Sequence, residues 1–452
     1  MILYLSVYIL SLFLLTKRSF FSSITLLLFT SPTARVFGNE NLVFYNMPIN
    51  NYLLYLVLPI FIIYKLFVNN RFKKEVITLF NSFRYFLIIL FTFLLSSIYY
   101  NLFVLESNIS YPFFITLSFF KGLICVIFLI YLTIENPIFN LFDEYKRLII
   151  ISFIYSIIVG IFQFDFMSLL GKYFVELYST KSEYALNSAL DLLLYFDFGR
   201  TTSIFSWTNQ FSAFLAFAGT ILFFISRYKL LDFLIILMTF SGFFLTSSRT
   251  GLILFFIFLF GSIVLKYKRY SFLILPISSV ISFILFDAFA GAFNERILNF
   301  IFGLINLDVH DYIFESRAIF WLNRLDELLK NFEFILFGSW YKISQYDYII
   351  ENGFLYVFII GGIFVVISYL IFISDYFYKS SILMKSDFLE LVNFGKASLI
   401  VSVILLVSEI SMSFYNSFRI TEYLSINYGF LGIFVIYYKN NKLKSNIKRN
   451  FL

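Results

Sequence analysis

The chain has 452 residues, of which 60% are hydrophobic and only 13% are charged. Soluble proteins carry about a quarter charged residues, so soluble globular classes are excluded and an integral membrane protein is predicted. The net charge of +7 does not indicate a nucleic-acid partner, because membrane proteins carry such an excess of Lys and Arg to fix their orientation.

Apolar runs recur along the whole chain, and a helix needs about 20 apolar residues to cross the hydrocarbon of a bilayer. We therefore predict an all-α polytopic bundle of about 12–14 transmembrane helices, forming a single transmembrane domain over residues 1–452. Residues 135–147 are interpreted as a short cytoplasmic loop. The predicted spans are 2–15, 19–36, 51–68, 84–104, 113–134, 148–168, 208–226, 230–247, 250–265, 271–287, 353–374, 396–414 and 423–438.

Two connections, 169–207 and 288–352, are much longer than the others. Each contains a helix-like stretch, at Lys181–Phe196 and Arg317–Phe332, so we expect both loops to fold against the bundle. About two-thirds of the Lys and Arg residues lie in the alternate loops and in the basic tail 439–452. The positive-inside rule therefore places the tail in the cytoplasm and both long loops outside.

The chain has few residues that could bind a metal. Cys125 and His310 are its only cysteine and its only histidine, whereas a thiolate or histidine-rich metal site needs several such side chains. P-loop, GxSxG and HExxH patterns are missing from the sequence. We predict no metal and no cofactor, and candidate chemistry rests on ionisable residues near the outer side.

Two arginines are predicted at the outer membrane face. Arg200 precedes the span that begins near Asn209, and Arg249 lies in a tight turn between two spans. Placing a guanidinium at such a boundary costs free energy unless it meets an anion, so both are candidate anion ligands. The alternative is an arginine that extends to the lipid headgroups.

A second arginine pair lies in the long loop 288–352. Arg317 and Arg324 are seven residues apart, which is about 20° short of two helical turns, so they share one face of a helix. Two guanidiniums on one face can bind a diphosphate. A solvated helix surface is the alternative.

Three further ionisable residues are candidates. Asp347 and Glu351 lie where the second long loop enters the next span, and a carboxylate there can act as a general base or simply begin a helix. Lys121 falls about 12 Å inside its span, which makes it either a functional residue or a lysine reaching to the interface.

Four local patterns follow one another in order on the predicted outer side. They are GRTTSIFSWTNQ before a span, LTSSRTG between two spans, ESRAIFWLNRL leading to ILFGSW, and DYIIENGFLYVFIIGGI entering a span. Together they resemble the bacterial O-antigen polymerase and ligase superfamily. Ligases of this superfamily have a histidine before an asparagine at the last position, where this chain has Glu351-Asn352, so the resemblance favours the (Wzy-type) polymerase branch.

The resemblance implies a metal-independent glycosyltransferase that polymerises oligosaccharide repeat units carried on undecaprenyl diphosphate. Its active site would face the periplasm at the outer face of the bacterial inner membrane, and the product would be O-antigen or a related surface polysaccharide. Implied partners are the lipid-linked oligosaccharide, membrane lipid, and a chain-length regulator and flippase of the same pathway, with no nucleic acid.

Residue roles follow from the same resemblance together with the side-chain chemistry. Glu351 is the expected base, with Asp347 in reserve and Asn209 and Asn352 in support. The expected diphosphate ligands are Arg249, Arg317, Arg200, Arg324 and Lys121. The alternatives are a ligase that transfers the glycan to lipid A-core, a lipid-linked oligosaccharide flippase, and a structural subunit of an envelope complex.

Overall fold

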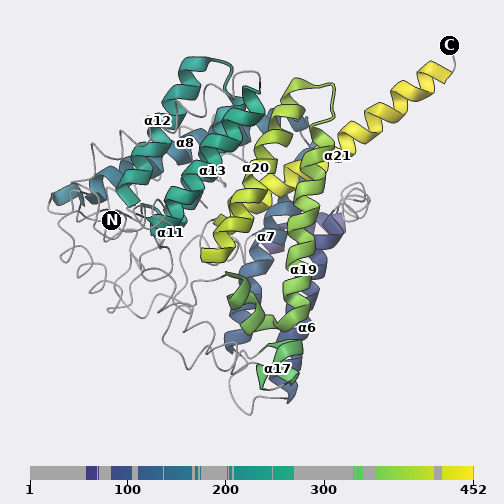
Figure 1. Cartoon of the computed structure of the whole chain (residues 1–452). Helices are drawn as coiled ribbons and strands as arrows, with labels where there is room; N and C mark the ends of the chain where they lie inside the picture. The colour runs from purple at the N-terminus through teal and green to yellow at the C-terminus, as the bar shows by residue number, and fades with distance from the viewer. Residues whose placement is uncertain are drawn as a thin grey trace. The chain divides into compact units, whose positions relative to one another are not determined.

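The structure is a computed structural model that describes residues 58–68, 70, 83–103, 110–135, 137–164, 168–171, 174, 201, 203–205, 208–246, 248–268, 329–330, 332–338, 353–411 and 420–450. Every regular element in these residues is a helix, and they contain no strand. The described part of the chain thus agrees with the predicted all-α class (Figure 1).

The helices have the following bounds. They are α4 (Leu58–Val68), α6 (Arg84–Phe103), α7 (Ser110–Glu135), α8 (Ile138–Phe164), α11 (Thr208–Ile225), α12 (Lys229–Thr246), α13 (Arg249–Lys266), α17 (Phe332–Phe337), α19 (Gly353–Leu383), α20 (Leu389–Ser411) and α21 (Ile420–Asn450).

Among the described residues, five helices are long and apolar enough to cross a membrane: Ile138–Phe164, Lys229–Thr246, Gly353–Leu383, Leu389–Glu409 and Ile420–Asn440. The chain is therefore a multi-pass membrane protein. The predicted spans 2–15, 19–36 and 271–287 and most of both long loops lie outside the described residues, so the total of about 12–14 spans stays a prediction.

The predicted loop 135–147 is wrong, because α8 begins at Ile138. Pro137 lies directly before the helix, and its carbonyl oxygen accepts from the N–H groups of Asn140 and Leu141. The charged residues that suggested a loop, Asp143 and Lys146, form an ion pair of 2.8 Å on one side of the helix. An apolar stripe at helical spacing is buried on the other side, at Leu141, Phe142, Tyr145, Leu148 and Ile149.

The chain divides into two compact units. Unit 1 comprises Met1–Tyr64 and Leu132–Ile301, and unit 2 comprises Lys65–Tyr131 and Phe302–Leu452.

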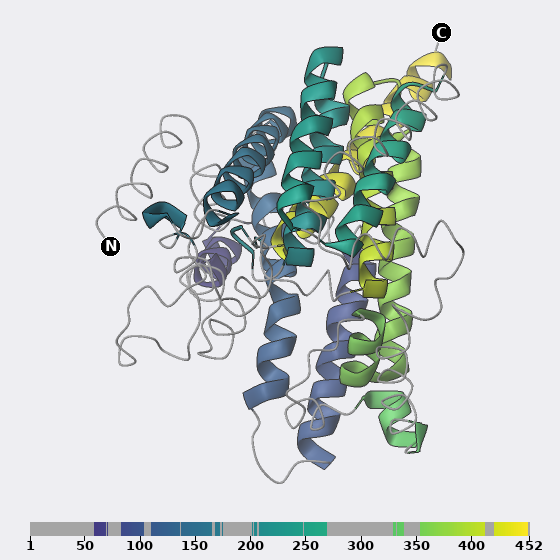
Figure 2. The same ribbon diagram turned by 60° about the vertical axis from the view of Figure 1, so that its left-hand side comes forward.

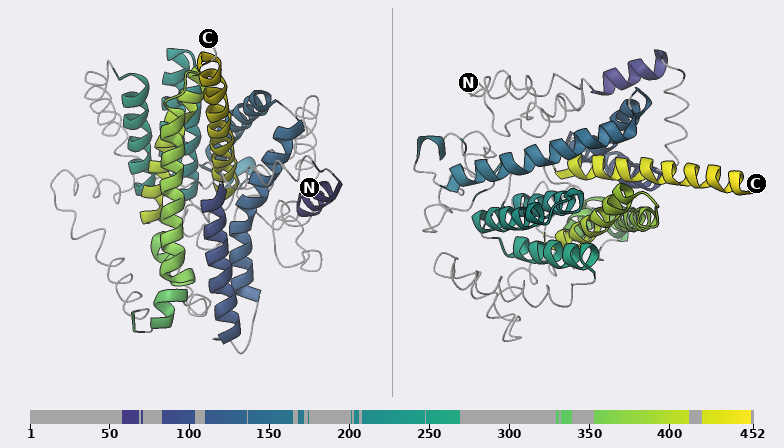
Figure 3. Two further views of the ribbon diagram at one scale, coloured as in Figure 1. Left: turned by 90° about the vertical axis from the view of Figure 1, so that its right-hand side faces the viewer. Right: turned by 90° about the horizontal axis from the view of Figure 1, so that it is seen from above.

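In unit 1, α11 is the central helix and packs against α8, α12 and α13. Nearly every side chain from Phe211 to Phe224 is buried, so this apolar helix is enclosed by its neighbours. The three helices α11, α12 and α13 are joined by short turns and run up and down beside one another (Figures 1 and 3). As a result, α11 and α13 begin at the same end of the group.

In unit 2, α19 is the central helix and packs against α6, α17, α20 and α21. It lies alongside α6 for much of its length (Figures 1 and 2). The interior is rich in tyrosine, and Tyr369, Tyr376, Tyr423 and Tyr428 are all fully buried. Apolar residues such as Phe91 and Phe364 are exposed, as expected for a surface that faces lipid.

Candidate functional site

The structure describes only part of the predicted site. The side chains of Lys121 and Asn209 are described, and Arg249 is described as the first residue of α13. The remaining predicted residues lie outside the described residues: Arg200, Arg317, Arg324, Asp347, Glu351 and Asn352. The site is therefore built from the segments that flank them.

The starts of α11 and α13 are tied together in unit 1. Ser248 is the N-cap of α13, where its Oγ accepts from the N–H of Gly251 at 3.2 Å, and the same Oγ is 2.5 Å from Oδ1 of Asn209 in the first turn of α11. Gly251 allows this approach, because a Cβ there would lie 2.5 Å from Cβ of Ser212 and 2.4 Å from the ring of Phe243. The predicted residue Asn209 thus belongs to the α11–α13 contact.

The residue after Arg200 is tied to the turn that carries Arg249. The N–H of Thr201 donates to the carbonyl of Leu245 at 3.1 Å, and the Thr201 hydroxyl donates to the same oxygen at 3.3 Å. Leu245 lies in the last turn of α12, four positions before Arg249. Two sequence patterns that lie far apart along the chain, around Arg200 and Arg249, therefore enter the same end of unit 1.

Ser203 holds this entering segment in a strained conformation. Its φ of 53° is left-handed, which costs a residue other than glycine roughly 1–2 kcal/mol. Three hydrogen bonds hold the conformation: the N–H to Oε1 of Gln163 at 2.7 Å, the hydroxyl to the carbonyl of Ser156 at 2.5 Å, and the amide of Gln163 to the carbonyl of Ser203 at 2.9 Å. We call Gln163, Thr201, Ser203, Asn209 and Ser248 the entry cluster.

The electrostatics of the entry cluster favour an anion. α11 and α13 both begin there, and each helix start carries about half a positive charge from its free N–H groups. Neither helix has Asp or Glu in its first turn, whereas α12 has Asp232 in that position. Arg249 is the first residue of α13. An added anion would be stabilised by both helix starts.

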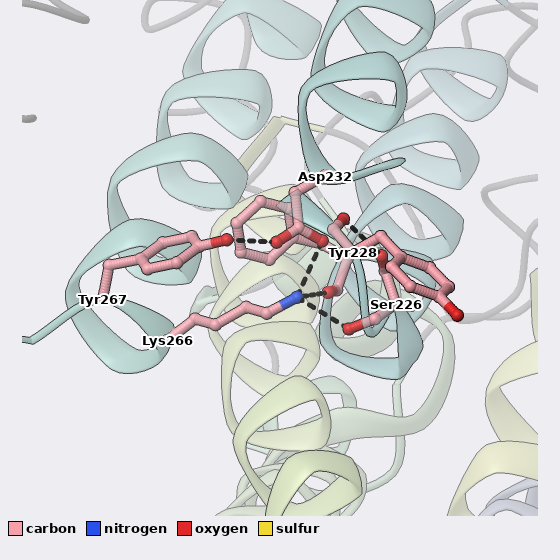
Figure 4. Close-up of polar contacts among 6 residues, drawn as sticks. Ser226, Tyr228, Asp232, Lys266 and Tyr267 are labelled. Atoms are coloured by element: carbon pink, nitrogen blue, oxygen red, sulfur yellow. Dashed lines mark hydrogen bonds and ion pairs between the residues drawn. The ribbon is translucent and has the colours of Figure 1, made fainter. Parts of the chain in front are cut away.

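At the opposite end, the same three helices are joined by contacts of Lys266, Asp232 and Tyr267, which we call the clamp (Figure 4). The Nζ of Lys266 donates to Oδ1 of Asp232 at 2.7 Å and to the carbonyls of Phe223 at 2.5 Å and Ser226 at 3.0 Å, where α11 ends. The Tyr267 hydroxyl donates to the other carboxylate oxygen of Asp232. Burial, together with this hydrogen bond, raises the pKa of Tyr267. All the clamp's charged groups have partners, so it joins α11, α12 and α13 structurally.

In unit 2, Lys121 is part of a buried ion pair. Its Nζ lies 3.9 Å from Oε1 of Glu422, and the two residues are 8% and 1% exposed. Neither carboxylate oxygen of Glu422 has a hydrogen-bond partner among the described residues. Lys121 therefore lies inside the helix bundle beside a carboxylate, and its contribution to phosphate binding stays a prediction.

Other buried charges of unit 2 are cross-links between helices. Tyr369 of α19 donates to Glu409 of α20 at 2.5 Å. Lys379 forms an ion pair of 2.7 Å with Asp375 and donates to the hydroxyl of Tyr428 in α21 at 2.8 Å. Because these groups form hydrogen bonds and an ion pair with one another, we interpret them as structural contacts between α19, α20 and α21.

A close contact between two glycines joins the third and fourth sequence patterns. Gly338 and Gly362 have φ values of 80° and 72°. A Cβ on Gly338 would lie 2.1 Å from the carbonyl oxygen of Ile360, and one on Gly362 would lie 2.2 Å from that of Leu336. We call these contacts, between Leu336–Gly338 and Ile360–Gly362, the glycine junction. The glycines of ILFGSW and FIIGGI are therefore needed for backbone-to-backbone packing.

Sequence reasoning missed several of these residues. Glu409 and Lys379 could have been found from the sequence, because charged residues inside membrane spans are usually functional or paired. Gln163 gave no comparable signal, because its partner lies 40 residues away in a segment without regular structure. Among the described residues, no group of three or more His, Cys, Asp or Glu side chains could hold a metal ion.

Comparison of the chain with models of known protein families gives no match, and comparison with curated proteins gives none either.

Proposed function

We propose that the chain is a glycosyltransferase of the bacterial inner membrane that polymerises oligosaccharide repeat units carried on undecaprenyl diphosphate. The reaction takes place at the periplasmic face and yields O-antigen or a related surface polysaccharide. The order of the four sequence patterns supports this proposal, as does the multi-pass helical fold.

One observation carries the proposal: the entry cluster supports an anionic ligand. Thr201 is hydrogen-bonded to Leu245, which ties the Arg200 pattern to the turn before Arg249. The helix starts of α11 and α13 meet there through Ser248 and Asn209, without an acidic residue in either first turn. A diphosphate would supply negative charge to balance the positive helix starts and Arg249.

The proposed step transfers a glycan between two lipid-linked molecules. A hydroxyl of the acceptor sugar loses its proton to Glu351, with Asp347 as the alternative base. The hydroxyl oxygen forms a bond to the anomeric carbon of the growing glycan, while the bond from that carbon to the diphosphate oxygen breaks. Undecaprenyl diphosphate leaves as an anion.

The departing charge is the part of the reaction that arginines can stabilise. We assign Arg249 and Arg317 to the diphosphate, with Arg200 and Arg324 assisting, because planar guanidiniums bind phosphate oxygens in pairs. Such charge stabilisation is worth about 10²–10³ in rate for a single well-placed donor. Asn352 is assigned to support Glu351.

The experiment is glycan laddering on a gel from cells that lack this gene and are complemented with variants. Arg249→Ala and Glu351→Gln are compared with Arg227→Ala and Asp387→Asn, which change exposed residues in the turns after α11 and α19. We expect the deletion to leave core with one repeat, and only the first two variants to fail in restoring the ladder at normal protein levels.

Three outcomes contradict parts of the proposal. A full ladder with Arg249→Ala at normal protein level removes the diphosphate assignment. Polymer that remains on the lipid carrier, unattached to lipid A-core, identifies a ligase. Single repeat units stranded on the cytoplasmic side identify a flippase.

A further inference from the structure

The helix α19 is interrupted inside the membrane-spanning part of unit 2. At Gly362 the backbone has φ 72° and ψ −172°, which is not helical, although helix continues on both sides. An interruption leaves carbonyl and N–H groups without their usual helical partners. In an apolar environment those groups must be satisfied by neighbouring protein, so broken membrane helices occur where protein packs onto them.

A segment of the second long loop packs onto this interruption. Leu336–Gly338 meets Ile360–Gly362 in the glycine junction described above, with each glycine facing a carbonyl of the other segment. Such an approach leaves no space for a side chain at either glycine. The two segments are therefore in fixed register with one another.

Ser96 of α6 holds both segments from a third side. Its side chain is buried, and its hydroxyl donates to the carbonyl of Phe337 and lies 3.5 Å from the carbonyl oxygen of Ile360. One turn further along α6, the ring of Tyr99 stacks on that of Phe337, with 4.0 Å between the ring centroids. One face of α6 thus holds Leu336–Gly338 against the helix interruption.

The two fastened segments are those that lead to predicted catalytic groups. Gly353–Gly361, the segment of α19 before the interruption, directly follows Glu351-Asn352 in the sequence, and α17 follows the stretch that contains Arg317 and Arg324. Any displacement at the glycine junction would be transmitted along this short helical segment to its start. A displacement of 1 Å at reacting groups can cost about a hundredfold in rate.

We propose that Ser96 is a positioning residue: it holds the glycine junction so that the α19 segment Gly353–Gly361 presents Glu351 to the acceptor hydroxyl. This role rests on the proposed polymerase function. Ser96 acts through Phe337 and Ile360 and does not contact the substrate.

The chain offers a matched control for this role. Thr92 lies one turn before Ser96 on α6, and its Oγ1 is 2.8 Å from Oγ of Ser368 on α19. Thr92 and Ser96 therefore each join α6 to α19 through a hydroxyl, but Thr92 contacts the helix beyond the interruption. Thr92→Val and Ser96→Ala each delete one hydroxyl between the same two helices.

The test uses the purified full-length protein and the lipid-linked repeat unit isolated from cells that lack the gene. For wild type, Ser96→Ala, Ser96→Thr and Thr92→Val, kcat, KM for the repeat unit and the melting temperature are measured. We expect Ser96→Ala to lower kcat at least about tenfold with little change in KM. Thr92→Val should keep wild-type kcat while lowering the melting temperature as much as Ser96→Ala does, and Ser96→Thr should recover most of kcat.

Each other outcome has a definite meaning. If Ser96→Ala and Thr92→Val change kcat equally, or if neither changes it, Ser96 is a structural contact and the inference is wrong while the polymerase function stands. If the wild type does not elongate the repeat unit at all, the proposed function fails, and the role of Ser96 fails with it.

Discussion

At the scale of single residues, Gly338 and Gly362 are the positions with least freedom to change. Both have left-handed φ values, and an added Cβ would lie about 2 Å from a backbone oxygen that cannot rotate away. We expect Gly338→Ala and Gly362→Ala each to lower the free energy of unfolding by at least about 2 kcal/mol. Unfolding in mixed detergent micelles measures this.

The matched control is Gly160→Ala in α8. A Cβ there would lie 3.1 Å from the edge of the Phe211 ring, which can shift slightly, and helical alanine is favoured over glycine. We expect a change within about 1 kcal/mol. Equal effects at Gly160 and Gly362 would show that backbone conformation at the junction is unimportant.

The pair Lys121 and Glu422 makes a second residue-scale prediction. Removing one member of a buried ion pair leaves the other charge uncompensated, at a cost of about 3–5 kcal/mol. We expect Lys121→Met to be strongly destabilising, and Glu422→Gln to restore part of that loss in the double variant. A double-mutant cycle on unfolding free energies measures the coupling, and strictly additive losses would contradict a direct interaction.

At the scale of elements, Lys266 determines how α11, α12 and α13 are joined. Lys266→Met removes donors to two carbonyls at the end of α11 and to Asp232 of α12. We expect a loss of about 2–3 kcal/mol in unfolding free energy. Lys146→Met is the control, because its partner Asp143 is 57% exposed and such pairs contribute less than about 1 kcal/mol. Losses of the same size would mean that the clamp is not a stabilising feature.

The sequence predicted the positions of elements better than their contacts. For α6, α11, α12 and α13 the predicted bounds lie within two residues of the observed ones, because apolar runs between polar turns mark both ends. The start of α8 was missed, since its charged residues resembled a loop until the buried stripe beneath them was seen. Periodicity describes one helix at a time and does not show its partners.

For the candidate site, the sequence predicted the backbone position of one residue. Arg249 was placed at a tight turn correctly, and it is the first residue of α13. The hydrogen bond from Thr201 to Leu245 and the left-handed backbone at Ser203 depend on packing between distant segments. The glycine junction likewise needed the structure, because a glycine pair in an apolar run is equally compatible with an unbroken helix.

At the scale of the whole molecule, the charge distribution predicts the orientation of the helices in the membrane. α11 has 18 residues and therefore rises about 27 Å, close to the thickness of the hydrocarbon. Its two ends should consequently lie at opposite membrane faces. The excess of Lys and Arg in alternate loops predicts that the end near Tyr228 lies in the cytoplasm and that the entry cluster lies on the outer side.

Single-cysteine labelling tests this orientation. Cys125 is the only cysteine and is 3% exposed, so Cys125→Ser gives a silent background. Leu169 and Tyr228 are 86% and 69% exposed, and Asp387 is exposed in the turn before α20. We expect Leu169→Cys to react with a membrane-impermeant maleimide in spheroplasts, whereas Tyr228→Cys and Asp387→Cys react only after the inner membrane is permeabilised. Labelling of Tyr228→Cys in intact spheroplasts, with Leu169→Cys protected, would invert the topology and place the entry cluster in the cytoplasm, where a periplasmic polymerase could not use it.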